Sequence, residues 1–132
     1  MEQQEYLIDS NVVIDYLGKK FPLVSMRFLN NVIDSIPNIS IITKIEVLGF
    51  ITTDEHYKLL EDFMADASVL DLSNNIVDQT IKIRKFQKTK LPDSIIAATA
   101  IINDFILLTR NVKDFDNIPN LKIINPWIIE DS

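Results

Sequence analysis

Short apolar runs alternate along this chain with longer stretches in which apolar residues recur every three or four positions. Short continuous apolar runs are typical of strands buried on both faces, whereas the wider spacing indicates helices with one buried face. The runs predicted to be strands are 6–8, 38–42, 68–72, 105–108 and 121–124. The stretches predicted to be helices are 12–17, 22–33, 43–51, 55–66, 75–88 and 92–103.

Strands that alternate with helices require crossover connections, which produce a parallel sheet covered on both faces. The segment 92–103 has hardly any polar face, so we expect that helix to be buried on most sides. The pattern therefore predicts a three-layer α/β fold with a five-stranded parallel sheet flanked by helices. A length of 132 residues fits one domain, 1–132, with its core at about 6–125.

Composition excludes several classes of protein. No apolar run approaches the roughly 18–20 residues that cross a bilayer, so we expect no membrane association. The polar, acidic start of the chain lacks the basic residues of a secretory signal, and no cysteine is present. We therefore expect a cytoplasmic protein without disulfides. The only glycines are Gly18 and Gly49, which excludes glycine-rich phosphate loops.

The net charge of −6 argues against nucleic-acid binding driven by the field of the whole protein. The positive charge is nevertheless concentrated locally, because five of the thirteen basic residues fall within nine positions: Lys82, Arg84, Lys85, Lys88 and Lys90. This basic segment leads directly into Asp93. The basic segment could equally be the ordinary solvated face of a helix, with no role in binding nucleic acid.

Acidic side chains follow the predicted strands. Asp9 comes directly after the first strand, Glu46 lies about one helical turn past the second, and Asp93 starts the buried helix before the fourth. The polar residues that follow the fourth strand are Asn111, Asp114 and Asp116. In open parallel sheets, ligands bind beyond the carboxyl ends of the strands. We therefore expect these distant acids to converge on one edge of the sheet.

Carboxylates that are brought together repel each other, and a hard divalent cation such as Mg²⁺ or Mn²⁺ relieves that repulsion. Such an ion can bind a scissile phosphate and activate water without a histidine base. Each acid also has a purely structural interpretation. Asp9 can cap the helix that follows it, Glu46 can form a capping box with Thr43, and Asp93 can occupy an ordinary first turn.

Other residues are given structural roles. The apolar neighbours of Glu46, which include Ile45 and Phe50, predict a largely buried helix. The single histidine, His56, has no second ligand at metal-binding spacing and is predicted to lie on a helix surface. Asp15 is expected to face away from Asp9, and Trp127 to be a packing anchor.

Four segments resemble, in order and spacing, the motifs of PIN domains, especially those of VapC-type toxins of toxin–antitoxin pairs. They are 7–17, 42–48, 91–100 and 107–115, and the resemblance extends from 6 to about 125. The resemblance implies a Mg²⁺- or Mn²⁺-dependent endoribonuclease that leaves a 5′-phosphate and a 3′-hydroxyl. Asp9, Glu46 and Asp93 match the first three acidic positions, which are the metal ligands.

The fourth acidic position differs from the family pattern, because Asn111 stands where many members carry an acid. Asp114, or alternatively Asp116, is expected to replace that acid as a catalytic residue, or Asn111 itself to hold a metal-bound water. Residues expected to support the site or contact phosphate are Ser10, Asn11 and Thr109. Residues expected to contact RNA are Arg110, Lys85, Lys88 and Lys90.

The resemblance also implies a homodimer and a cognate VapB-like antitoxin that blocks the site with a basic residue. Three alternatives remain. A phosphoacceptor signalling domain is suggested by Asp71 near the third strand, but it would need an acidic pair after the first strand, where Ser10 follows Asp9. A degenerate PIN domain would bind RNA or protein without cutting. A DNA flap nuclease would use the same metal chemistry with further insertions.

Overall fold

The computed structural model describes residues 4–129 and confirms the predicted α/β architecture. The strands are β1 (Tyr6–Ile8), β2 (Asn38–Ser40), β3 (Ser68–Leu70), β4 (Ile106–Leu108) and β5 (Lys122–Ile124). The helices are α1 (Ser10–Leu17), α2 (Leu23–Asp34), α3 (Ile41–Leu48), α4 (Asp54–Asp66), α5 (Asn74–Phe86), α6 (Leu91–Asn103) and the short 3₁₀ helix η1 (Val112–Asp114).

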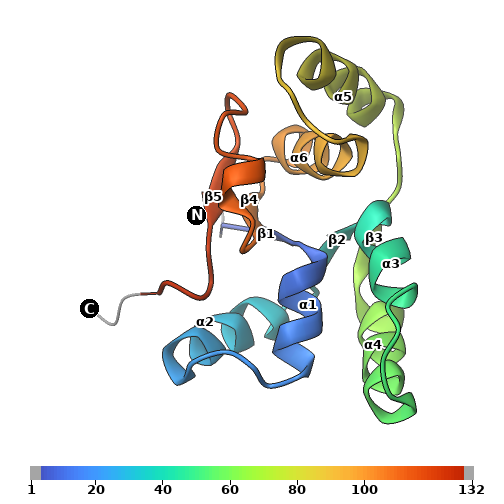
Figure 1. Ribbon diagram of the computed structural model, residues 1–132, viewed down its shortest axis with the longest axis vertical. Helices are drawn as coiled ribbons and strands as arrows, with labels where there is room; N and C mark the ends of the chain where they lie inside the picture. The colour runs from blue at the N-terminus through green and yellow to red at the C-terminus, as the bar shows by residue number, and fades with distance from the viewer. Residues whose placement is uncertain (1–3, 130–132) are drawn as a thin grey trace.

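All neighbouring strands pair in parallel, in the order β3-β2-β1-β4-β5 (Figure 1). The strand β1 is therefore central, between β2 and β4. Doubly wound signalling domains of the flavodoxin type have the order 2-1-3-4-5, so this topology excludes the phosphoacceptor alternative.

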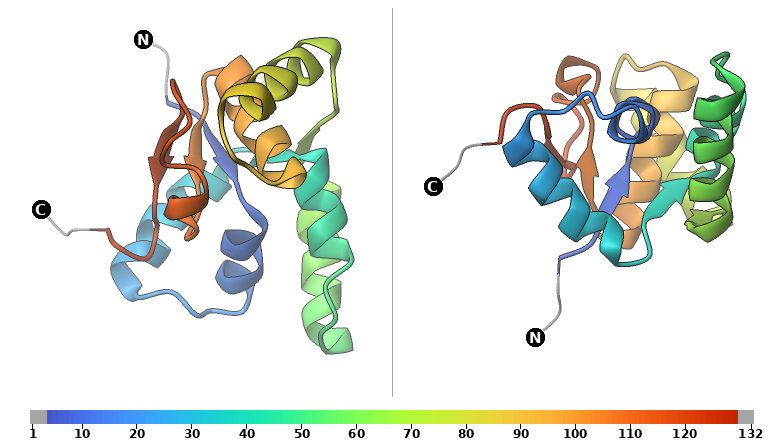
Figure 2. Two further views of the ribbon diagram at one scale, coloured as in Figure 1. Left: turned by 45° about the horizontal axis from the view of Figure 1, so that its top comes forward. Right: turned by 90° about the horizontal axis from the view of Figure 1, so that it is seen from below.

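The sheet separates two hydrophobic clusters, because successive side chains of a strand point to opposite faces. Leu7 and Leu107 pack with residues of α5 and α6 on one face. Ile8 and Leu108 pack on the other face with residues of α1 to α4. Figures 1 and 2 show the corresponding layers, with α5 and α6 on one side of the strands and α1 and α2 on the other. The three-layer prediction is confirmed.

Hydroxyl and carboxylate side chains fix where most helices begin. Asp9, Ser40, Thr53 and Ser73 each occupy the residue before a helix and accept a hydrogen bond from its first turn. Such caps satisfy backbone N–H groups that have no partner within the helix. The helix α6 differs, since Lys90 precedes it without a side-chain cap and a proline occupies its first turn.

Two predictions about α3 are wrong. The strand β2 ends at Ser40, which caps α3, so the helix begins at Ile41 and the predicted capping box of Thr43 and Glu46 does not form. The helix is also not largely buried, because Ile45 is 64% exposed and Phe50, just beyond it, is 39% exposed. Only one stripe of α3 faces the core, and it includes Thr43 and Val47. Apolar composition alone could not distinguish that stripe from the exposed face.

No helix in residues 4–129 is both long enough and apolar enough to cross a membrane. The expected cytoplasmic location stays a prediction.

Candidate active site

Asp9 lies at the carboxyl end of the central strand, and three residues hold its side chain. Its carboxylate accepts hydrogen bonds from the backbone N–H of Ser10 at 2.8 Å, from Nδ2 of Asn11 at 3.2 Å and from Oγ1 of Thr109 at 2.7 Å. Only 4% of the residue is exposed. The predicted cap role of Asp9 is therefore confirmed, although the helix begins at Ser10 rather than at Val12. One oxygen caps α1, and the orientation of the whole carboxylate is fixed.

The pairing of β1 with β4 brings Asp9 and Thr109 together across 100 positions of sequence. Ile8 is in register with Leu108, and the backbone N–H of Asp9 donates to the carbonyl of Leu108 at 3.0 Å. Burial raises the pKa of Asp9, and the hydrogen bonds from Thr109 and its other partners oppose that rise without cancelling it. Thr109 therefore stabilises the charged form of a buried carboxylate.

Replacing Thr109 with valine is expected to destabilise the chain by about 1–3 kcal/mol, because a buried carboxylate oxygen loses a hydrogen-bond donor. Urea unfolding measures the change. Thr99→Val is the matched control, since Thr99 is equally buried but bonds only to a carbonyl of its own helix. Equal losses of stability in the two variants would mean that the bond to Asp9 has no special role.

Glu46 comes from the second turn of α3 and meets Asp9 through the hydroxyl of Ser10. That hydroxyl donates to Oε1 of Glu46 at 3.0 Å and lies 3.5 Å from Oδ1 of Asp9. Burial raises the pKa of Glu46. The hydrogen bond from Ser10 lowers it, and the negative charges of Asp9 and Asp93 raise it again. Glu46 thus lies within the electrostatic reach of two other acids.

Asp93, in the first turn of α6, links this pair to the loop after β4. Burial raises its pKa most, the charges of Asp114 and then Asp9 raise it further, and Lys90 lowers it. The four carboxylates of Asp9, Glu46, Asp93 and Asp114 therefore form one interacting set, which we call the acidic cluster. None of them forms an ion pair with a lysine or arginine in residues 4–129.

The acidic cluster does not form a preassembled triad of metal ligands. Within the described part of the chain, no three His, Cys, Asp or Glu side chains are placed to hold one ion. Mg²⁺, however, keeps several of its waters and is commonly bound through one or two carboxylates. The donors here are all oxygen atoms, and burial, followed by repulsion from the neighbouring acids, raises the pKa of Glu46 and of Asp93. This donor chemistry fits a hard divalent cation.

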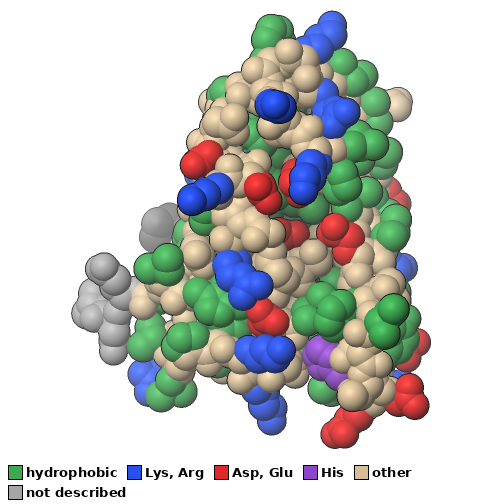
Figure 3. Space-filling model, in the orientation of Figure 1, with side chains coloured by type: hydrophobic (Ala, Val, Ile, Leu, Met, Phe, Trp, Pro, Cys, Tyr) green, Lys and Arg blue, Asp and Glu red, His purple; other side chains and the backbone are tan. Residues whose placement is uncertain are grey.

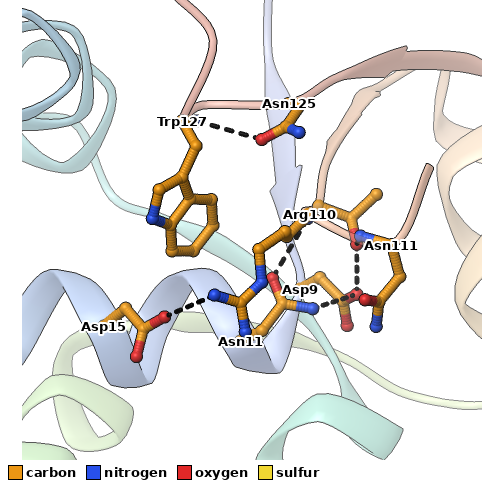
Figure 4. Close-up of polar contacts among 8 residues, drawn as sticks. Asp9, Asn11, Asp15, Arg110, Asn111, Asn125 and Trp127 are labelled. Carbon is orange, nitrogen blue, oxygen red and sulfur yellow. Dashed lines mark hydrogen bonds and ion pairs between the residues drawn. The ribbon is translucent and has the colours of Figure 1, made fainter. Parts of the chain in front are cut away.

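Arg110 is held beside the site rather than within it (Figure 4). Its guanidinium lies 3.6 Å from Oδ2 of Asp15 and 4.7 Å from the ring centre of Trp127. Its backbone N–H donates to Oδ1 of Asn11 at 3.2 Å. Asp15 therefore interacts with Arg110 and is outside the acidic cluster, as expected. The role of Arg110 as an RNA contact stays a prediction.

Trp127 is confirmed as a packing anchor. Its ring lies 3.8 Å, centre to centre, from that of Phe21, and Arg110 lies against it as well.

The prediction that His56 lies on a helix surface was wrong. Oγ1 of Thr52 lies 2.9 Å from its Nδ1, and its Nε2 is buried without a hydrogen-bond partner among residues 4–129. The surface pattern of α4 gave no signal that this ring turns inward.

The remaining residues that were predicted for the site lie in different places. Asn111 is exposed, and its backbone N–H donates to Oγ1 of Thr109 at 3.1 Å. Asp114 and Asp116 line a cavity of about 510 Å³ together with Asp93, Lys88 and Lys90. Lys85 is exposed on α5 and does not line it. Lys113, which also lines this cavity, was missed because nothing in the sequence distinguished it from an ordinary loop lysine.

The sequence model of the PIN domain matches residues 6–121, and the chain belongs to that family. A chain of a toxin–antitoxin complex from Klebsiella pneumoniae is 28% identical, with a TM-score of 0.75 and coverage of 95% of this chain and 100% of the other. No curated protein is similar enough in sequence to count as a match.

Two further structures share the fold. One is DNA-bound VapBC from Salmonella typhimurium, which is 24% identical with a TM-score of 0.77 and covers 94% of this chain and 99% of the other. The second is VapBC2 from Rickettsia felis bound to a DNA fragment from its promoter. It is 23% identical with a TM-score of 0.74, and the match covers 92% of this chain and 98% of the other.

Proposed function

We propose that the chain is a metal-dependent endoribonuclease and the toxin component of a toxin–antitoxin pair. The observation that carries the proposal is the acidic cluster at the carboxyl edge of the sheet, where the buried Asp9 and three acids that are more exposed repel each other and form no ion pair with a basic residue in residues 4–129. Membership of the PIN family and the likeness to the Klebsiella pneumoniae complex support the same assignment.

In this proposal Asp9, Glu46 and Asp93 hold the Mg²⁺ or Mn²⁺. When bound, the ion would supply Lewis-acid chemistry by contacting the scissile phosphate and lowering the pKa of a water molecule. Ser10 fixes the spacing of two ligands, because its hydroxyl lies between Asp9 and Glu46. Thr109 and Asn11 hold the carboxylate of Asp9 in one orientation before substrate arrives.

The fourth acidic position is assigned to Asp114 rather than to Asn111 or Asp116. The charge of Asp114 is the largest electrostatic contribution to the raised pKa of Asp93, second only to burial. Asp116 makes no such contribution there. A carboxylate three residues later in the loop thus compensates for the amide at position 111.

The proposed partners are an RNA substrate, a VapB-like antitoxin and a second copy of this chain. The net charge of −6 suits an antitoxin that places a basic side chain in the acidic cluster. The proposed location, where RNA and such a partner are both present, is the cytoplasm.

The test is to incubate the purified chain with single-stranded and structured RNA in Mg²⁺ or Mn²⁺, then to repeat the reaction with EDTA. We expect cleavage that needs the metal and leaves 5′-phosphate ends. Asp114→Asn is expected to lower the rate by about tenfold or more, equivalent to about 1.4 kcal/mol, with a smaller effect in Asp116→Asn.

Tight RNA binding without metal-dependent cleavage would favour the degenerate PIN domain. Cleavage of DNA flaps in preference to RNA would favour the third alternative. A larger loss in Asn111→Ala than in Asp114→Asn would return the fourth position to Asn111.

A further inference from the structure

Beside the acidic cluster lies the cavity of about 510 Å³, which we call the lysine pocket. Its walls come from two segments far apart in sequence, the α5–α6 loop with the start of α6 and the segment around η1. Three lysines, Lys88, Lys90 and Lys113, line it together with three aspartates, Asp93, Asp114 and Asp116. Its volume is within the range of small-molecule sites and can hold a phosphate group with part of a nucleotide.

The ammonium groups of this pocket are available to a ligand. None of the three lysines forms an ion pair with any of residues 4–129. The amino end of α6 also faces this region without a side-chain cap at Lys90, and a helix amino end carries a partial positive charge. Three ammonium groups beside an uncapped helix end can therefore contact an anion, although Asp93 lies in the first turn of that helix and two further aspartates line the pocket.

The wall of the pocket is held in place before any ligand arrives. A guanidinium nitrogen of Arg84 donates to the carbonyl of Thr89 at 2.8 Å, and the hydroxyl of Ser94 donates to the carbonyl of Lys90 at 2.9 Å. The hydroxyls of Thr89 and Ser94 also bond to each other. The loop that carries Lys88 and Lys90 is thus tied to α5 and to α6, which lowers the entropy lost when a ligand binds.

Lysines and acids share this pocket in an arrangement that suits a nucleic-acid backbone. A phosphodiester approaching the acidic cluster is repelled by its carboxylates, whereas lysines immediately beside them attract the next phosphate along the strand. Lys90 is near enough to Asp93 to lower its pKa, so the two charge regions adjoin. In Figure 3, lysine and arginine side chains border acidic ones on the visible face.

Resting on the proposed nuclease function, we propose that the lysine pocket binds a backbone phosphate of single-stranded RNA next to the scissile one. Lys88, Lys90 and Lys113 contact that phosphate. The pocket recognises charge rather than bases, because phosphate contacts position a strand without reading its sequence. Of the four residues predicted as RNA contacts, the structure places Lys88 and Lys90 here and adds Lys113.

The test is metal-free binding of a fluorescent single-stranded RNA, measured by anisotropy in EDTA over a series of salt concentrations. The triple variant Lys88→Gln, Lys90→Gln and Lys113→Gln is compared with a control in which Lys58, Lys82 and Lys122 are changed to glutamine. All six lysines are exposed, so folding should be retained, and circular dichroism checks this. Both triple variants change the net charge equally.

We expect the pocket variant to bind about tenfold more weakly and to lower the salt-dependence slope by about 0.7, since the three lysines neutralise one phosphate and each phosphate neutralised on a single strand contributes about 0.7. The control should change both values much less. An equal loss in the two variants, or no loss in either, would overturn the proposal. A loss confined to one RNA sequence would also overturn it, because the pocket would then be reading a base.

The binding measurement separates this proposal from the nuclease assignment. If RNA is bound through the three lysines but never cut, the pocket stands and the assignment of catalysis fails. If metal-dependent cleavage occurs while the lysine variants bind RNA as the wild type does, catalysis stands and the pocket fails.

Discussion

Asp9→Asn is expected to lower the rate of RNA cleavage by at least about 100-fold, because the proposed metal site would lose a ligand and with it several kcal/mol of transition-state stabilisation. The variant should still fold. The side-chain oxygen of asparagine can accept the capping bond from the backbone N–H of Ser10, and asparagine is as good a helix cap as aspartate. The measurement is the initial rate on one RNA substrate, with thermal unfolding checked alongside.

Asp93→Asn should lower the rate of RNA cleavage by a similar factor. Asp78→Asn is the matched control and should leave that rate unchanged. Asp78 is exposed on α5 and makes no contribution to the pKa shifts of the acidic cluster. Full activity in Asp9→Asn with pure protein would mean that the chemistry occurs elsewhere in the chain. Equal losses in all three variants would point to a general charge effect.

Mg²⁺ is expected to raise the melting temperature of the wild type by about 10 °C when present at 100 times its dissociation constant. Preferential binding to the folded state at that concentration adds about 2.7 kcal/mol, and a domain of this size responds by a few degrees per kcal/mol. Thermal unfolding with and without Mg²⁺ at constant ionic strength measures the shift. Asp9→Asn should show much less of it, and Asp78→Asn should show all of it.

The stabilisation of the folded chain by Mg²⁺ should also depend on pH. The pKa values of Asp9, Glu46 and Asp93 are raised in the folded chain above the ordinary values of 3.8 for aspartate and 4.5 for glutamate. The folded state therefore binds these protons more tightly than the unfolded state does. Their contribution to stability is fully present below the ordinary values and is lost as pH rises through the raised ones.

The stabilisation by Mg²⁺ should consequently increase as the pH rises through the raised pKa values, because protons and the ion compete for the same carboxylates. Stabilisation by Mg²⁺ that is equal in wild type and Asp9→Asn, or that does not change with pH, would contradict a metal site in the acidic cluster.

The layers of the fold could be predicted because each depends on a local pattern. Buried runs such as 6–8 and 106–108 are apolar at every position, which is typical of strands covered on both faces, and α6 is apolar on nearly all sides. The convergence of the acids followed from the same reasoning, since residues that follow parallel strands share one edge. The order of the strands could not be predicted, because it is set by packing between distant segments.

Other features of the site could not be predicted, because they depend on contacts between segments that are far apart in the sequence. The start of α3 was misplaced because both Ser40 and Thr43 are good caps, and only the end of β2 decides between them. The hydroxyl of Ser10 lies between Asp9 and Glu46 because α1 and α3 are neighbours, which a sequence does not state. Lys113 was missed because only the fold brings it to the same cavity as Lys88 and Lys90.

The bond between Asp9 and Thr109 has a consequence for synthesis of the chain on the ribosome. Asp9 is made well before its partner Thr109, which follows the neighbouring strand 100 positions later. A nascent or truncated polypeptide that ends before β4 therefore contains the first acid without the strand that buries it. The site of Asp9 is therefore completed only after β4 and Thr109 have been made and have paired with β1.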